Sequence, residues 1–190
     1  MAHARSSRPL LALCAAVLCA LLALPAGAAA NATRGAACAN ADLVPDAGNL
    51  AAVRAAVLCL HNRERSARGL PALKEHAKLR KAAEGHSVHM VDARFFSHDA
   101  PDGEDMVDRI LGAGYAREAG WSLGENIAWG TGGLATAAEI HGAWMRSPGH
   151  KANILRRQFR DVGIGIALGA PIDDGGLDGA TYTADFGVRR

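Results

Sequence analysis

Two stretches near the carboxyl terminus decide the fold class: Val162–Leu168 (VGIGIAL) and Thr181–Val188 (TYTADFGV). In both, apolar side chains alternate with small or polar residues, and this period of two is typical of β-strands. The segment between them is rich in aspartate and glycine but lacks the ligand spacing of an EF-hand calcium loop. We therefore expect two antiparallel strands joined by a long, solvated turn.

The residues before these strands favour helices, because apolar side chains recur there at steps of three and four. Gly69 and Pro71 are typical of a helix end, whereas Ser147 and Pro148 are typical of a helix start. Helices that precede strands, without alternation, predict an α+β fold. The predicted helices cover residues 49–69, 76–93, 106–111, 137–144 and 148–155.

Length and composition bound the architecture and the partners. The chain has 190 residues, of which 49% are hydrophobic and 21% charged, so we expect one globular domain over residues 49–190. Once Arg5 and Arg8 are set aside, 19 Lys and Arg balance 19 Asp and Glu. A balanced charge provides no broad attraction for nucleic acid or for an anionic membrane, so we expect no nucleic-acid partner.

Residues 1–30 have the pattern of a secretory signal peptide. Arg5 and Arg8 precede an apolar run of about 15 residues, and small residues follow Pro25. The pattern predicts cleavage after Ala28 or Ala30. The apolar run is shorter than the roughly 20 residues that a spanning helix needs. We therefore expect a mature chain that is secreted or held in the cell envelope, without a transmembrane anchor.

The mature chain keeps two cysteines, Cys38 and Cys59, because Cys14 and Cys19 lie in the signal peptide. Export to an oxidising compartment favours a disulfide between them, and two free buried thiols are the alternative. Closing this loop should stabilise the fold by about 3 kcal/mol. The bond would tether an N-terminal arm, residues 31–48, to the first helix.

The polar candidates for chemistry are histidines and one glutamate. His86 falls on the apolar face of its helix, so we expect a hydrogen-bonded packing residue. His98 and His150 lie in segments with Gly or Pro, where an imidazole is often exposed to a cleft. Glu125 lies in an otherwise apolar segment and therefore needs a hydrogen bond or an ion partner.

Seven sequence blocks occur in an order that is similar to one known family. The blocks are His61–Arg65, His86–Met90, Phe95–His98, Gly124–Ala128, Ala143–Leu155, Phe159–Gly165 and Asp185–Gly187. With them, the chain resembles the CAP superfamily, also called the SCP domain, in its bacterial secreted form. The resemblance covers about 130 residues. It implies an α–β–α sandwich, in which helices flank a small, mainly antiparallel sheet.

The resemblance also implies a cleft built from two histidines and two glutamates. By motif, His98, Glu125 and His150 match three of these positions, whereas Ser147 stands where many eukaryotic members have the second Glu. The two imidazoles are candidate ligands for Zn²⁺ or another divalent cation, and Glu125 would orient water or a ligand. Because serine supplies no negative charge, we expect modest metal affinity, and no cofactor is required for the fold.

Three functions compete on this basis. The first is a non-enzymatic extracellular binding domain for a lipid, such as a sterol, or for a protein partner, and we expect this one. The second is a metal-dependent, peptidase-like hydrolase with His98 and His150 on the metal and Glu125 as general base. The third is an envelope-associated structural or interaction module. For the binding domain we expect a monomer.

Overall fold

The computed structural model describes Met1 and residues 37–116, 120–172 and 178–189. The predicted signal peptide, the first part of the predicted arm and most of the acidic turn lie outside these residues. The described residues from 37 onward belong to one compact unit. Among them, no helix combines the length and the apolar character needed to cross a bilayer.

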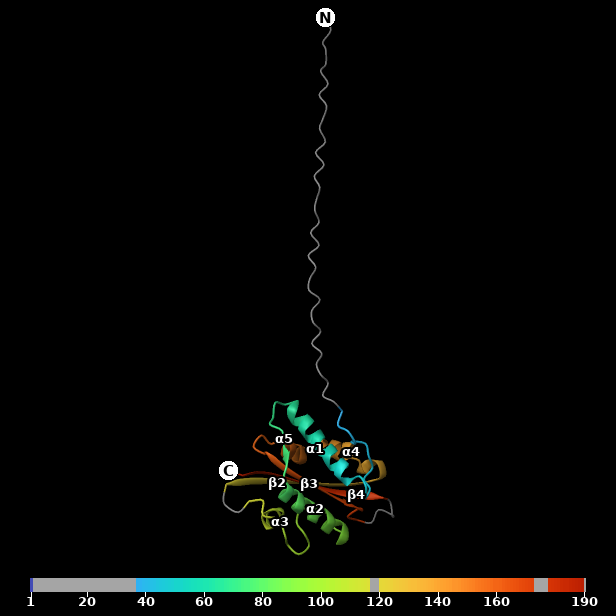
Figure 1. Cartoon of the computed structure of the whole chain (residues 1–190), viewed down its shortest axis with the longest axis vertical. Coiled ribbons are helices and arrows are strands. Elements are labelled where there is room, and N and C mark those ends of the chain that lie inside the picture. Colours follow the sequence, from blue (N-terminus) through green and yellow to red (C-terminus); the bar gives the residue numbers. More distant parts are fainter. Residues whose placement is uncertain (2–36, 117–119, 173–177, 190) are drawn as a thin grey trace. The chain divides into compact units, whose positions relative to one another are not determined.

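The unit has three layers, with a four-stranded sheet between two layers of helices (Figure 1). α2 and α3 cover one face of the sheet, and α1, α4 and α5 cover the other. The helices are α1 (Leu50–Ser66), α2 (Ala77–Asp92), α3 (Met106–Gly112), α4 (Ala137–Arg146), α5 (Pro148–Leu155) and the 3₁₀ helix η1 (Gly132–Ala135). The strands are β1 (Lys74–Glu75), β2 (Trp121–Thr131), β3 (Asp161–Leu168) and β4 (Gly179–Arg189). The α+β class and the sandwich expected from the resemblance are confirmed.

The strand order is β1-β3-β4-β2. β3 pairs with β4 in the predicted antiparallel way, and β2 pairs antiparallel with the other side of β4. β1 is parallel to β3. The sequence pattern did not predict β1 or β2. In β2, Glu125 and Asn126 stand side by side and both are buried, so the strand shows no simple alternation of apolar and polar residues.

α2 lies unusually close to β3, and two glycines make this possible. A Cβ atom at Gly163 would come within 2.0 Å of the Arg80 backbone nitrogen. One at Gly165 would come within 2.2 Å of the Ala83 carbonyl carbon. The alternating glycines of β3 therefore form a shallow groove that receives the backbone of α2.

Buried Arg65 connects α1 to the segment that enters β3. Its side chain is fully buried, and its guanidinium nitrogens donate only to backbone carbonyls. A buried charge is tolerated only when its donors are satisfied, and Arg65 has four such partners. The accepting carbonyls belong to Pro71, Ile154, Arg156 and Phe159. This one side chain therefore fixes the end of α1 against the end of α5.

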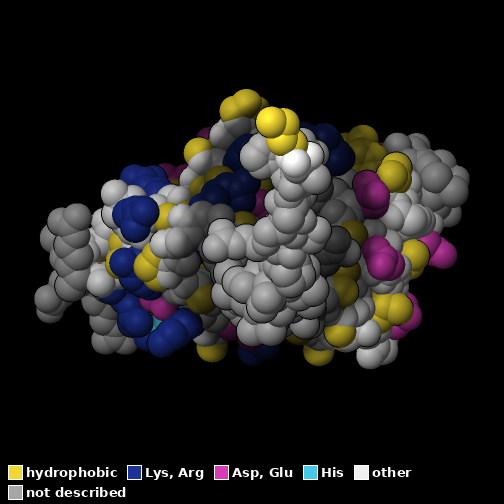
Figure 2. Space-filling model, turned by 90° about the horizontal axis from the view of Figure 1, so that it is seen from above, with side chains coloured by type: hydrophobic (Ala, Val, Ile, Leu, Met, Phe, Trp, Pro, Cys, Tyr) yellow, Lys and Arg dark blue, Asp and Glu magenta, His cyan; other side chains and the backbone are white. Residues whose placement is uncertain are grey.

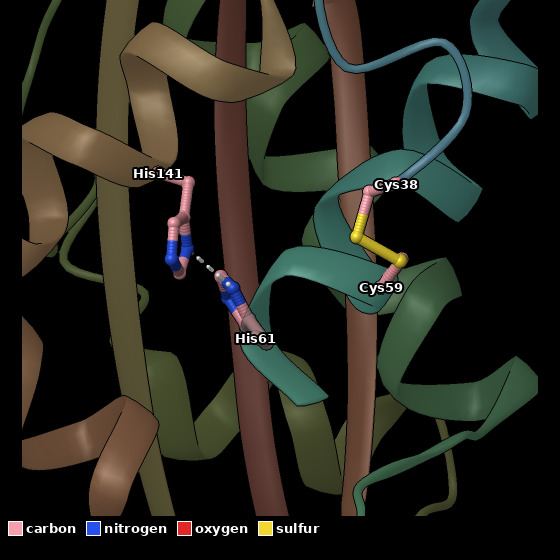
Figure 3. The surroundings of a disulfide bond; sticks show 4 residues. All are labelled: Cys38, Cys59, His61 and His141. Atoms are coloured by element: carbon pink, nitrogen blue, oxygen red, sulfur yellow. Dashed lines mark hydrogen bonds between the residues drawn. A yellow bond between two sulfur atoms is a disulfide. The ribbon is translucent and has the colours of Figure 1, made fainter. Parts of the chain in front are cut away.

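The predicted disulfide is present. Cys38 and Cys59 are bonded, with their Cα atoms 5.7 Å apart (Figure 3). Cys59 lies on α1, so the bond ties the segment before the helix to the helical layer, as expected. The described part of the tethered arm begins at residue 37.

Two histidines form a buried pair on the same side of the sheet. The Nδ1 atoms of His61 on α1 and His141 on α4 are 3.0 Å apart, so one ring donates to the other (Figure 3). The ring of His61 also stacks on Phe186 and meets the edge of Trp144. Burial lowers the pKa of His141 to about 4, and burial together with the charge of His141 lowers the pKa of His61. Both rings are therefore neutral in the folded protein at pH 7.

We predict that removing the disulfide destabilises the fold without changing it. The C38S/C59S variant should lose about 3 kcal/mol in free energy of unfolding, because its unfolded chain gains entropy. Urea denaturation of the wild type, the variant and the reduced wild type measures the difference. The intact protein should weigh about 2 Da less than its reduced form. Two alkylatable thiols in the secreted protein would contradict the prediction.

We also predict that stability falls on acidification because of the histidine pair. The pKa of His141 is about 4 in the folded state against 6.5 in a model peptide. Between these values the unfolded state binds more protons, so stability is present above pH 6.5 and is lost as pH falls towards 4. The loss from His141 should approach about 3 kcal/mol.

Urea denaturation at pH 7, 5.5 and 4 measures this loss. The H61F/H141F variant provides the comparison, since it keeps two aromatic rings but cannot titrate at these positions. Its free energy of unfolding should depend less on pH than that of the wild type. The same pH dependence in both proteins would exclude the histidine pair as the cause.

Candidate functional site

The site is centred on Glu125, which lies on β2 and has a side chain that is 2% exposed. Its Oε1 accepts a hydrogen bond from Nδ1 of His98 at 2.7 Å. Its Oε2 accepts one from Nη2 of Arg109 at 2.9 Å. This buried carboxylate was expected to need a hydrogen bond or an ion partner, and it has two partners, an imidazole and a guanidinium.

Arg109, on α3, joins three segments at this point. Besides Glu125, it donates to the carbonyl oxygens of Glu104 and His98, so it also fixes the loop that carries His98. The short helix begins with a capping box between Asp105 and Asp108, which sets its orientation. Sequence reasoning did not single out Arg109. The sequence indicated that a buried Glu125 needs a hydrogen bond or an ion partner. It did not indicate which residue provides it.

His86 supports the same loop from α2. Its Nε2 donates to the carbonyl oxygen of Ser97 at 3.0 Å, since a carbonyl can only accept. The ring is fully buried, and burial lowers its pKa, so the neutral form predominates. The expectation of a hydrogen-bonded packing histidine is confirmed. In addition, this hydrogen bond fixes the position of Ser97, the residue next to His98.

These contacts set the charges of the site. The hydrogen bond to Glu125 raises the pKa of His98 and outweighs the opposing effect of burial. Burial by itself would raise the pKa of Glu125, but the bond from His98 and the charge of Arg109 lower it. Glu125 is therefore ionised at neutral pH, and His98 carries more positive charge there than a free imidazole.

Asp185 lies opposite Glu125 on β4 and is fully buried. Burial is the largest cause that raises the pKa of Asp185 well above its ordinary value, and the negative charge of the neighbouring Glu125 raises it further. A single guanidinium, that of Arg109, acts on both carboxyl groups. We conclude that Asp185 is protonated, because the guanidinium is already bonded to Glu125. Sequence reasoning included Asp185 only as part of a motif block and missed this role.

His150 approaches the site from the other side. It lies in the first turn of α5, which begins at Pro148 as the sequence pattern predicted. Burial and the charge of His98 lower the pKa of His150, so the two rings are close enough to interact electrostatically. From the motif match we expect the two imidazoles to lie about 4–6 Å apart, close enough to share a divalent ion, and this stays a prediction.

Two asparagines join α5 to β2 beside the site. Asn126 donates to the carbonyl oxygen of His150 at 3.0 Å. Asn153 donates to the carbonyl oxygen of Glu125 and to the side chain of Asn126. Ser147 lies at the N-cap of α5, but its side chain makes no capping hydrogen bond. Sequence reasoning placed Ser147 correctly at the start of the helix and missed the asparagine link.

A cavity of about 300 Å³ opens beside His98 and Glu125. Its other walls combine acidic and apolar side chains, namely Asp99, Asp105, Met106 and Val107. Because the floor is fixed by hydrogen bonds, the cavity is preformed. It suits a small group that has both an apolar part and a polar end.

The donor set does not complete a metal site. Within residues 37–116, 120–172 and 178–189, no three His, Cys, Asp or Glu side chains come together as ligands. Nδ1 of His98 and both oxygens of Glu125 are already hydrogen-bonded within the site. Structural zinc sites use four protein ligands and catalytic sites use three. We therefore derive no chemical step through a metal.

Comparison with known proteins identifies the family. Residues 58–183 match the family model for CAP, the Cysteine-rich secretory protein family. The chain belongs to the CAP family. This match contains all the site residues named above except Asp185. It therefore confirms the resemblance on which the site residues were first chosen.

Individual CAP relatives agree with this assignment. YkwD of Bacillus subtilis is 36% identical over 109 residues, which are 57% of this chain and 40% of that protein. The structure of an extracellular protein with an SCP domain from Bacillus anthracis is 30% identical, with a TM-score of 0.55, over 75% of this chain and 41% of that one. The chain thus spans about two fifths of the length of these two relatives.

One further structure supports the fold alone. An outer surface protein of Borrelia burgdorferi has a TM-score of 0.54 at 19% identity. The similarity covers 70% of this chain and 90% of that protein. The sandwich architecture is thus found at low sequence identity.

We predict that Glu125 controls the charge of His98. In the E125Q variant the pKa of His98 should fall, because the neutral amide no longer stabilises the imidazolium. Titration of the histidine ring signals by NMR measures this change. In the wild type, His98 should titrate above 6.5 and His150 below it.

His76 is the control, since burial and charges other than Glu125 set its pKa. Its pKa should be the same in both proteins. An unchanged pKa of His98 in E125Q would contradict the predicted coupling. The stabilising effect of His98 is present below pH 6.5 and is lost as pH rises through its folded pKa.

Proposed function

We propose that this chain is a secreted, non-enzymatic binding domain whose cleft at His98 and Glu125 holds part of a partner molecule. The observation that carries the proposal is the state of Glu125. Both of its oxygens accept charge-assisted hydrogen bonds, and its pKa is lowered. A general base for hydrolysis would need a pKa nearer to neutrality and access to water. These fixed contacts support a recognition site that is formed before the partner arrives.

The cleft favours a protein partner over a lipid. Its volume of about 300 Å³ is at the lower end for ligand pockets, and its walls include carboxylates at Asp99 and Asp105. A lipid chain or a sterol would cover the carboxylate of Asp99 with apolar atoms and separate it from water. One side chain of a protein can place its apolar stem against Met106 and Val107 and its polar end near His98.

An extracellular location agrees with this proposal. The oxidised cysteine pair suits an oxidising compartment. The related Bacillus anthracis structure is described as that of an extracellular protein. The signal-peptide pattern of residues 1–30 indicates the same route. These relatives are matched over only about two fifths of their own length, so the proposal does not rest on their whole-protein functions.

The proposal predicts a retained molecule that depends on the cleft. Native mass spectrometry of the protein from its own secreted fraction should show a bound partner in the wild type. The V107D variant, which adds a charge to the cavity wall, should lose it. The V88D variant is the matched control, because Val88 is 43% exposed on α2 and does not line this cavity. Equal retention in both variants would contradict a role for the cleft.

The same preparations separate binding from hydrolysis. Peptide substrates are incubated with the wild type, H98A, E125Q and H150A, with and without Zn²⁺. No variant should differ from the background rate. Isothermal titration should show weak Zn²⁺ binding at most. Turnover that needs Zn²⁺ and is lost in all three variants would replace the binding proposal with the hydrolase.

A further inference from the structure

The even charge of the sequence conceals an uneven surface. Residues 143–160 carry no Asp or Glu. They form the end of α4, all of α5 and the loop that leads to β3. Their basic side chains are exposed, and we call them the basic strip: Arg146, Lys151, Arg156, Arg157 and Arg160.

The end of α1 extends this positive surface. Arg65 donates to the carbonyl oxygens of residues 154, 156 and 159, so the last turn of α1 lies against the basic strip. Exposed Arg63 and Arg68 lie on this turn and on the residues that follow it. The single acid there, Glu64, is paired with Arg68. Figure 2 shows Lys and Arg side chains gathered at the left end of the folded unit and Asp and Glu at the right.

The balancing negative charge is located elsewhere. The loop and helix start over residues 99–108 carry five acids and no Lys or Arg. The acids are Asp99, Asp102, Glu104, Asp105 and Asp108. They belong to the segment that leads into α3, on the opposite face of the sheet from α1 and α4. From the balanced composition we expected no broad attraction for anions. The uneven distribution of charge over the surface nevertheless allows a local attraction.

The basic strip has the chemistry of a phosphate-binding surface. Four of its five cations are arginines, whose planar guanidinium groups match phosphate oxygens in pairs. Arg146 precedes α5 and Arg156 follows it, and a helix of 8 residues is about 12 Å long. One phosphate cannot contact both ends. A chain of phosphates can.

A membrane is a less suitable partner for this surface. Proteins that bind at lipid surfaces usually combine basic residues with exposed apolar anchors. In the part of the chain that the structure describes, the large exposed apolar side chains all lie outside residues 143–160 and 63–74. Contact by charge alone suits a soluble polymer.

We propose that the basic strip binds a linear, phosphate-bearing polymer outside the cell. The arginines and Lys151 replace the counterions of successive phosphates, and the released ions favour association. This surface is distinct from the cavity at His98. The inference therefore goes beyond the proposed function and can hold or fail independently of it.

Long-chain inorganic polyphosphate is the probe for this proposal. We expect the full mature chain to bind it in low salt, with an affinity that falls linearly on a log–log plot against salt concentration. The K151S/R157S variant should bind at least about tenfold more weakly, with a salt dependence shallower by about 1.4–1.8 units for the two lost contacts. Both side chains are exposed and make no ion pair within the described residues, so the fold should not change.

The K81S/R94S variant is the matched control, because it removes the same charge from α2 and the residues that follow it, and both side chains are exposed and make no ion pair within the described residues. Its affinity should stay within about twofold of the wild type, and thermal unfolding checks that all three proteins are folded. Equal weakening in both variants would overturn the proposal in favour of unspecific charge attraction. Binding to vesicles of anionic phospholipid, but not to polyphosphate, would overturn it in favour of a membrane. Absence of binding to all probes in low salt would overturn it outright.

Discussion

The close contact of α2 with β3 is the constraint on which the remaining structure depends. Gly163 and Gly165 leave no room for a Cβ atom, so the backbone of α2 can lie directly on the sheet. At this distance Ser87 of α2 reaches Thr183 on β4 and donates a hydrogen bond to it at 2.9 Å. The neighbouring residue, His86, is thereby placed where it can hold the loop before His98. The position of the cleft thus depends on glycine at positions 163 and 165, where any side chain would push α2 away from the sheet.

A buried negative charge then organises the cleft itself. Glu125 is ionised inside the protein because Arg109 and His98 compensate its charge, and because Asp185 keeps its own proton. Removing one of these partners would leave an uncompensated charge in a region of low dielectric constant. The arrangement makes the site rigid, which agrees with the binding role proposed above. It also explains why an acid can be part of an otherwise apolar strand.

Charge is distributed over the surface in a way that gives the molecule distinct faces. Basic residues gather around α5 and the end of α1, and acidic residues gather before α3. The His98 cavity lies next to the acidic segment, while His150 on α5 begins the basic side.

The sequence by itself determined the elements with strong local signals and the chemistry of the central residues. Periodic apolar side chains, with Gly69 and Pro148 at helix ends, predicted five helices and the β3–β4 pair, and the disulfide followed from cysteine number. Only the tertiary structure decided which groups meet. Arg109, Asp185 and His141 have no local pattern, because their roles depend on partners from other segments. Likewise β2 became a strand because β4 satisfies its backbone, a long-range effect that no window of sequence contains.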